Sequence, residues 1–378
     1  MNLKNYKAGI FTKEYGYKSF QPNHLDKEWV IDSPQLNTLL EEANYRLGQL
    51  NAFSTFIPDI DVFIKMHIVK EATQSSRIEG TRTNLDEAVL EEKNILPEAK
   101  DDWQEVQNYI GAMNYSVKRL KKLPLSSRLI REAHTILMQG VRGKHKSPGE
   151  FRKTQNWLGG ATISDAVFIP PHHTLVPELI ADLEKFLNND NINVPHLIRI
   201  GMAHYQFEAI HPFLDGNGRI GRLLITLYLV NNNLLNKPTL YLSDFIEKNR
   251  STYYTNLIRV SEKNDMDQWL KFFLVGIIET SKIATDTFNR IITLREKLEK
   301  ETIVNLGKKI PNAKALLTYL YSKPVVTVTD VINNLGTTKP TASSLINDFY
   351  SLGILKEQTG FRRNRIFVFA DYLKLFEN

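Results

Sequence analysis

The chain has 378 residues, of which 42% are apolar and 24% charged, and it contains no cysteine. This length and composition are typical of a globular protein of two or three domains. The lack of cysteine excludes disulfides, thiolate zinc sites and cysteine nucleophiles. The longest apolar runs, such as residues 223–230, are too short to span a bilayer, and the N-terminus lacks a signal-peptide core. We therefore expect a cytoplasmic protein with no membrane partner.

The positive charge is unevenly distributed along the chain. The net charge is +6, and residues 308–378 hold 10 Lys and Arg against 5 Asp and Glu, a net charge of +5. The rest of the chain is close to neutral. A polyanionic partner is therefore expected at the C-terminal segment rather than at the body.

Helical periodicity dominates the chain up to about residue 303. Residues 35–93 carry helical patterns, one of which ends at Gly80 as a C-cap, and residues 103–139 predict two more helices. Glycines and prolines then surround residues 162–171, which predict a β-hairpin, and helical patterning returns from residue 176. The expected fold class is mainly α, with a small β-hairpin and an N-terminal helical region.

The C-terminal segment has a different pattern. Residues 313–324, 328–336 and 339–355 predict three helices, and residues 355–360 and 363–371 predict a two-stranded hairpin. This order is typical of a winged helix-turn-helix. We therefore expect an N-terminal helical region over 1–105, a central core over 106–300 and a winged helix-turn-helix over 301–378.

The stretch HPFLDGNGRIGR, residues 211–222, lies between two predicted buried helices. Its glycines fit G-x-G-x-x-G, but a dinucleotide-binding turn needs a preceding strand and an acidic residue about 20 positions later. Here a helix precedes the glycines and an Asn-rich stretch follows. A zinc site through His211 and Asp215 is also disfavoured, because Pro212 and the glycine turn deny them a shared helix face and no third ligand has suitable spacing.

A polyphosphate site accounts for this stretch better. Free N–H groups at a glycine-rich turn and a helix N-terminus bind anions. Arg219 and Arg222 lie one helical turn apart and can hold separate phosphates. Asp215 suits Mg²⁺ that bridges phosphate oxygens, and a neutral His211 can take a proton from an attacking hydroxyl. The alternative is a helix-capping histidine with two solvated arginines.

The stretch resembles the signature of the Fic family, His-Pro-Phe-x-[Asp/Glu]-Gly-Asn-Gly-Arg-x-x-Arg, at every fixed position. The resemblance implies a Fic-type helical core and a protein adenylyltransferase, which transfers AMP from ATP to a Ser, Thr or Tyr hydroxyl of a protein and releases pyrophosphate. ATP and hydroxyl-bearing proteins, including the enzyme itself, are the implied partners, and Mg²⁺ is the implied cofactor.

The resemblance also implies a role for each matched residue. His211 would be the catalytic base, Asp215 would hold Mg²⁺, and Arg222 would bind the γ-phosphate. Doc-type kinases carry Lys where Gly218 stands, which favours AMP transfer over phosphate transfer. The implied nucleotide-binding residues of the motif are Gly216, Asn217, Gly218, Arg219, Ile220, Gly221 and Arg222.

Two further segments carry the resemblance towards the base of the nucleotide. Residues 149–160, GEFRKTQNWLGG, followed by VFIPP at 167–171, resemble the flap that aligns a target segment by β-augmentation. Leu158 would then contact adenine, and Tyr254 resembles the family's adenine-side tyrosine. Without the family, Tyr254 reads as a core aromatic residue.

The stretch SSRIEG at 75–80 resembles the family's inhibitory motif, through Ser75, Glu79 and Gly80. It closes a helix upstream of the core, as in the self-inhibited class with an N-terminal inhibitory helix. A carboxylate paired with Arg222 would occupy the place of the γ-phosphate and repel the triphosphate. Autoinhibition by Glu79 is our hypothesis, with an exposed helix end as the alternative.

Three questions stay open at this level. The Fic-like core could sense nucleotide for a DNA-binding regulator, or it could remove AMP from targets with Glu79 positioning water. Winged helices also mediate protein contacts, and a homodimer that masks the inhibitory helix is compatible with the sequence. If the C-terminal segment binds DNA, the candidate contacts are Thr338, Lys339, Thr341, Ser343, Ser344, Asn347, Arg362, Arg363 and Arg365.

Overall fold

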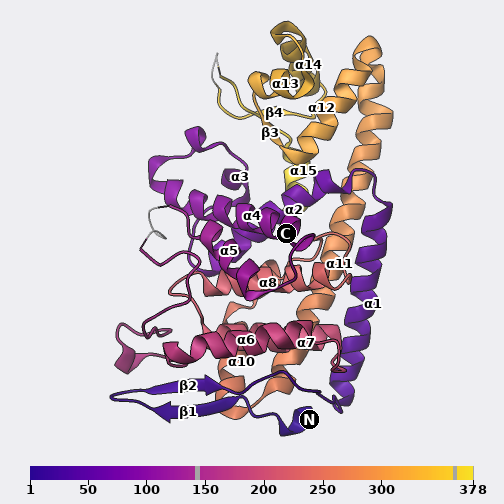
Figure 1. Ribbon diagram of the computed structural model, residues 1–378. Coiled ribbons are helices and arrows are strands. Elements are labelled where there is room, and N and C mark those ends of the chain that lie inside the picture. Colours follow the sequence, from indigo (N-terminus) through magenta and orange to yellow (C-terminus); the bar gives the residue numbers. More distant parts are fainter. Residues whose placement is uncertain (141–144, 361–363, 378) are drawn as a thin grey trace.

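The computed structural model describes residues 1–140, 145–360 and 364–377, and these residues are mainly α-helical, as predicted (Figure 1). The predicted contacts Arg362 and Arg363 lie outside the described residues. None of the described helices combines the length and the apolarity needed to cross a lipid bilayer. The helices of the body are α1 (Pro34–Phe56), α2 (Ile60–Ile78), α3 (Leu85–Ala88), α4 (Lys100–Leu120), α5 (Ser127–Leu137), α6 (Val176–Asn188), α7 (His196–Ile210), α8 (Asn217–Asn231), α9 (Ser243–Lys248), α10 (Arg250–Lys263) and α11 (Met266–Lys297).

The N-terminal region begins with a β-hairpin, which the prediction of a helical region over residues 1–105 did not include. Strands β1 (Gly9–Lys13) and β2 (Lys18–Pro22) pair antiparallel along their whole length. The hairpin depends on tertiary contacts: the N–H of Phe20 donates to the carbonyl of Ile169 at 2.8 Å, and the Phe20 ring is fully buried beside Phe168. Local periodicity alone could not show these contacts.

Helices α7 and α8 form the centre of the body. The sequence predicts one apolar face on each, but thirteen of the fifteen residues of α7 are buried. Helices α6, α8, α10 and α11 all pack against α7, so it is covered on nearly every side. Central helices of this kind hold their ends rigidly, which matters because the 211–222 loop joins these two.

Helix α2 connects the body to the C-terminal domain. It begins after Asp59, whose φ of +59° turns the chain, and it ends just before Gly80, whose φ of +107° requires glycine. It packs against α4 and α9 in the body and against α12 (Ile310–Ser322) in the C-terminal domain. This helix is therefore packed against both the body and the C-terminal domain.

The C-terminal domain, at the opposite end of the molecule from the β1–β2 hairpin (Figure 1), contains the predicted helices and hairpin and one further strand. A three-stranded antiparallel sheet has the order β3-β5-β4. The name winged helix-turn-helix stays a prediction from this order of elements. The elements are α12, β3 (Val325–Val326), α13 (Val328–Leu335), α14 (Lys339–Ser351), β4 (Lys356–Glu357), β5 (Phe367–Val368) and α15 (Ala370–Leu373).

Candidate active site

The loop between α7 and α8 has a rigid, defined shape. His211 caps α7 with a left-handed φ of +49°, and Gly216 opens α8 with a φ of +77°. Asn217 fastens the loop, since its Oδ1 accepts from the N–H of Phe213 at 2.8 Å and its Nδ2 donates to the carbonyl of the same residue at 2.9 Å. A strained conformation at a non-glycine residue, held by surrounding bonds, is typical of functional positions.

His211 is suited to accept a proton. Burial lowers its pKa to about 4, so the imidazole is neutral at pH 7. Its Nδ1 lies 3.4 Å from the carbonyl oxygen of Glu208. With the proton on Nδ1 directed to that carbonyl, the lone pair of Nε2 is available to a ligand.

Arg152 clamps the loop from the side of the predicted flap, a role that sequence analysis missed. It is 3% exposed, and its own N–H donates to the carbonyl of Pro212 at 2.8 Å. Burial lowers its pKa to about 10, so it stays charged at pH 7. In the sequence, Arg152 is a single arginine in GEFRKT. Nothing local marks its role, because most of its partners are distant in the chain. Its guanidinium donates to the backbone carbonyls of Thr154, Pro171, Ile210 and His211.

His134 on α5 also supports the loop, and sequence analysis did not identify it. Its Nε2 lies 3.0 Å from the carbonyl oxygen of Asp215, and its Nδ1 accepts from the N–H of Gly149 at 2.8 Å. The ring stacks on Phe213 at 3.8 Å with an interplanar angle of 7°. Burial lowers the pKa of His134 to about 4, so it acts as a neutral structural bridge.

The segment predicted as a β-hairpin flap is mostly loop. It keeps a single antiparallel bridge between Leu158 and Phe168. Gly159 and Gly160 both have positive φ values, and the two prolines at 170–171 lack N–H donors, so a longer ladder cannot form here. The bridge still places Leu158 over the cavity described next.

A cavity of about 450 Å³ lies between this bridge, α7, α8 and α10. Tyr253 and Tyr254 both line it, but Tyr254 is 39% exposed, whereas Tyr253 is 1% exposed and is the core aromatic residue of the pair. Apolar, aromatic and charged side chains thus line one cavity. Of the predicted site residues, those that line it are Glu79, Leu158, His211, Gly218, Arg222 and Tyr254.

The other predicted nucleotide-binding residues do not line this cavity. The side chain of Ile220 is buried in the core, and Gly221 packs so closely that an added Cβ would lie 2.2 Å from the Oε1 of Glu208. Side-chain contacts from these two positions are therefore excluded, and only backbone contacts stay open. The same holds for Gly216, while Asn217 uses its side chain within the loop.

Glu79 and Ser75 meet Arg222 directly. The Nη2 of Arg222 donates to Oε1 of Glu79 at 2.6 Å and to the carbonyl of Ser75 at 2.8 Å, and its Nε donates to the Ser75 hydroxyl at 2.8 Å. The side chain of Arg222 is 1% exposed and that of Glu79 is 32% exposed. Helix α2 thus delivers one carboxylate to the most buried cation of the cavity.

The carboxylate of Glu79 lies beside Gly218, at the start of α8. A Cβ added at Gly218 would lie 2.3 Å from its Oε1, so only glycine leaves room for it. Burial raises the pKa of Glu79, but the charge and hydrogen bond of Arg222, with Arg219 and His211, hold that pKa below its ordinary value. Glu79 is therefore ionised at neutral pH.

Asp215 and Arg219 lie just outside the cavity. Arg219 is 4% exposed and donates to Glu105 at 2.9 Å, with the Oδ1 of Asp215 at 3.8 Å. The described residues contain no cluster of three metal-ligating side chains. A single carboxylate, 46% exposed beside a helix N-terminus, fits Mg²⁺ that takes its other ligands from phosphates and water.

The chain is similar to known proteins in two consecutive segments. Residues 37–118 match the family model described as "Fic/DOC family N-terminal", and residues 124–229 match the model described as "Fic/DOC family". The protein adenylyltransferase Fic of Drosophila erecta is 28% identical over 203 residues, and that of Drosophila melanogaster is 27% identical. These matches cover 52% of this chain and 37% of the length of each relative.

Solved structures share the fold. A Fic family protein from Desulfovibrio desulfuricans matches with a TM-score of 0.57 and 21% identity, over 91% of this chain and 98% of that one. A Fic domain containing signaling protein from Bacteroides thetaiotaomicron matches with a TM-score of 0.52 and 16% identity, over 67% of this chain and 96% of that one. These similarities extend to the fold alone.

Proposed function

This chain belongs to the Fic/DOC family, and from that premise we propose that it is an ATP-dependent protein adenylyltransferase held inactive by Glu79. One observation carries the proposal: neutral His211 and the paired Arg222 line the same cavity, which Leu158 and Tyr254 also line. A triphosphate fits the cationic end at the start of α8, and a base fits between Leu158 and Tyr254.

The reaction follows from these positions. Nε2 of His211 takes the proton of a target hydroxyl, and the oxygen attacks the α-phosphorus of ATP. The bond to the bridging oxygen breaks, and pyrophosphate leaves with that electron pair. Arg222 and the free N–H groups at the start of α8 hold the phosphates. Bound Mg²⁺, held by Asp215, would neutralise charge on the phosphate oxygens.

The gate consists of one ion pair. Glu79 uses the guanidinium that would otherwise bind the terminal phosphate, and its own charge repels that phosphate. Withdrawing the end of α2 frees Arg222 without changing His211. Arg152 keeps the catalytic loop in place meanwhile, because it bonds the loop and not the gate.

Incubating the Glu79→Gly protein with α-labelled and γ-labelled ATP in parallel tests the proposal. Adenylyl transfer leaves label on protein from the α position alone, and His211→Ala in the same background abolishes it. Label retained from the γ position alone would identify a kinase and overturn the proposal. No label from either nucleotide would also overturn the proposal.

Removal of AMP from modified proteins is a second proposal, supported by the ionised Glu79 carboxylate inside the cavity. A carboxylate there can orient a water molecule towards the phosphorus. Incubating AMPylated protein with Mg²⁺ and no ATP tests it. Release of AMP that Glu79→Gln abolishes supports the proposal, and no release contradicts it.

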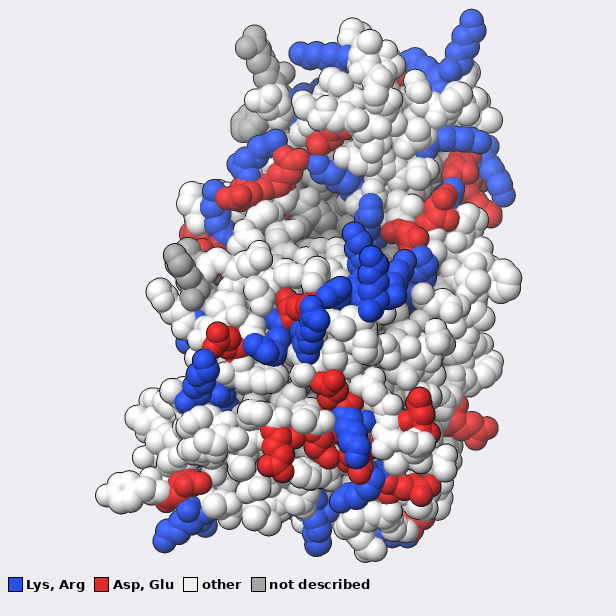
Figure 2. Space-filling view, in the orientation of Figure 1, with Lys and Arg blue, Asp and Glu red and all other residues white. Residues whose placement is uncertain are grey.

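DNA binding by the C-terminal domain is a weaker proposal. Acidic and basic side chains are interleaved over the face in Figure 2, and several cations of this domain already have partners. Lys309 pairs with Asp348 at 2.6 Å, and Arg365 lies over the rings of Tyr350 and Phe367. The salt dependence of binding to duplex DNA tests the proposal, and no binding at low salt contradicts it.

A further inference from the structure

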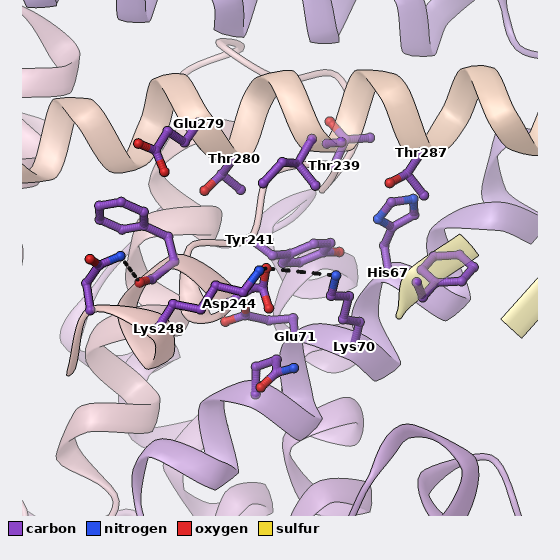
Figure 3. A pocket seen from close by; sticks show the side chains of 16 residues that line it. His67, Lys70, Glu71, Thr239, Tyr241, Asp244, Lys248, Glu279, Thr280 and Thr287 are labelled. Atoms are coloured by element: carbon purple, nitrogen blue, oxygen red, sulfur yellow. Dashed lines mark hydrogen bonds and ion pairs between the residues drawn. The ribbon is translucent and has the colours of Figure 1, made fainter. Parts of the chain in front are cut away.

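A second cavity, of about 120 Å³, borders α2 away from the nucleotide cavity (Figure 3). It lies between α2, α9, α11 and the end of the chain at Phe376, and it shares no lining residue with the first cavity. Its volume holds several water molecules or a small metabolite. The lining residues that offer polar groups to a ligand include His67, Lys70, Gln74, Asp244, Lys248 and Glu279.

Two buried polar atoms of this lining have no hydrogen-bond partner among the described residues. They are Nε2 of His67, a residue that is 6% exposed, and Oε1 of Gln74. Burial lowers the pKa of His67 to about 3, so the ring is neutral and offers one N–H. Buried polar atoms are nearly always bonded, so these two indicate a place for a further molecule.

The charges of the lining limit what that molecule is. Lys248 lies 3.0 Å from Asp244, but Lys70 lies 3.9 Å from the same carboxylate, too far for a hydrogen bond. The side chain of Lys70 is only 15% exposed. Figure 3 shows Lys70 and Lys248 approaching Asp244 from two sides, below α11. Lys70 therefore has donor capacity left for an acidic group.

The remaining carboxylates exclude a simple anion. Glu71 is fully engaged, because Ser243 donates to it through its hydroxyl at 2.6 Å and its N–H at 3.2 Å, and Tyr109 donates at 3.0 Å. Besides Glu71, the lining carries two carboxylates, on Asp244 and the exposed Glu279, and two lysines, so it presents both signs of charge. A bare anion or a bare cation meets a like charge here, whereas a molecule with both charges does not.

The cavity is also joined to the gate. Gln74 directly precedes Ser75, which binds Arg222 through its hydroxyl and its carbonyl. Glu71 links the same helix to Ser243 at the start of α9, the helix that carries Asp244. A ligand held between α9 and α2 therefore acts on the helix whose last turn leads to Glu79.

We propose that this second cavity binds a small zwitterion of the size of a free amino acid. Its carboxylate lies on Lys70 and His67, and its ammonium group faces Asp244 and Glu279. The ligand biases α2, and hence the contact of Glu79 with Arg222. This last step rests on the proposed function, whereas binding itself does not.

Thermal unfolding of the full-length protein tests the binding. The probes are glycine, alanine, β-alanine, γ-aminobutyrate, lysine and glutamate at 10 mM, with acetate and ethylamine as single-charge controls. At ten times its Kd, a bound probe raises the melting temperature by about 1–3 °C. Lys70→Met and His67→Phe abolish the rise, and Lys118→Met, remote from the cavity, keeps it.

Three results would overturn the site: no zwitterion shifts the melting temperature, acetate shifts it equally, or Lys70→Met retains the shift. The effect on the gate is measured separately, as transfer of α-label with and without the bound probe. The probe changes transfer by the wild-type protein and leaves Glu79→Gly unchanged. An equal change in both refutes the coupling, while an inactive Glu79→Gly protein refutes the proposed function and leaves the binding result standing.

Discussion

The two cavities that border α2 differ in how their charges are held. In the first cavity, Arg222 is paired with Glu79, which lies at the end of a helix, next to a glycine with a positive φ. In the second cavity, the lysines share Asp244, which belongs to α9. Under the proposed function, the carboxylate of the first cavity leaves its cation, whereas that of the second cavity stays beside its lysines. The contrast shows that the element carrying a charge matters as much as its sign.

Removing the base of the first cavity has the largest expected effect. His211→Ala in the Glu79→Gly background lowers the rate of α-label transfer about 10²–10⁴-fold, because no other group takes the hydroxyl proton. ATP binding, measured by calorimetry, is retained. A variant that keeps its transfer rate would show that the first cavity does not perform this chemistry.

The next largest effect is expected from removing the Glu79 carboxylate. Glu79→Gly frees Arg222, and a charge-assisted hydrogen bond contributes about 1.5–3 kcal/mol. Because Glu79 is about one third exposed, we expect the lower part of that range, a roughly 10–30-fold rise in transfer. Glu79→Gln, which keeps the shape without the charge, gives a smaller rise. Unchanged transfer in both variants contradicts the gate.

A smaller effect, on stability, is expected from removing Arg152, which holds the backbone beside the first cavity. Arg152→Ala leaves buried carbonyls without their donor and lowers the free energy of unfolding by about 2–4 kcal/mol. Urea denaturation measures this loss, with Lys153→Ala, an exposed neighbour, as the matched control. Equal effects of the two substitutions would show that the clamp contributes nothing.

Lowering the pH should destabilise the folded protein through buried histidines beside both cavities. His67, in the second cavity, and His204, which bonds Tyr253 beneath the first, have their pKa values lowered by burial to about 3. The unfolded chain binds protons at these positions from about pH 6.5 downwards, while the folded chain does not, so stability falls as pH falls. The melting temperature should decrease by several degrees between pH 6.5 and 4.5. A flat profile over this range contradicts neutral buried rings.

The smallest effect is expected at Ser75, an uncharged side chain of α2 that accepts a hydrogen bond from Arg222. Ser75→Ala removes the bond from Nε of Arg222 and keeps the bond to the Ser75 carbonyl. The hydroxyl acceptor is uncharged, so losing this bond from the guanidinium costs less than losing the ion pair, about 0.5–1.5 kcal/mol, and transfer rises roughly 2–10-fold. In the Glu79→Gly background the same substitution has no further activating effect. An additive rise there would mean that Ser75 acts outside the gate.

Much of the candidate site could be predicted from the sequence because its parts are close in the chain. Residues 211–222 specify a loop between two helices through one proline and three glycines, and the structure has this loop. The pairing of Glu79 with Arg222 was also predicted, through the resemblance to a family motif. The β-hairpin at residues 9–22 was missed, because Phe20 is held by a flap residue about 150 positions away.

By itself, the sequence determined the mainly helical fold and the glycine-rich turn between two buried helices, since helical periodicity and glycine spacing act over a few residues. Only the tertiary structure decided which groups share a cavity: it brought Arg152 and His134 to the loop, turned Ile220 into the core and placed Lys70 near Asp244. Burial and the pairing of charges depend on distances between remote segments, and these distances exist only in the folded chain.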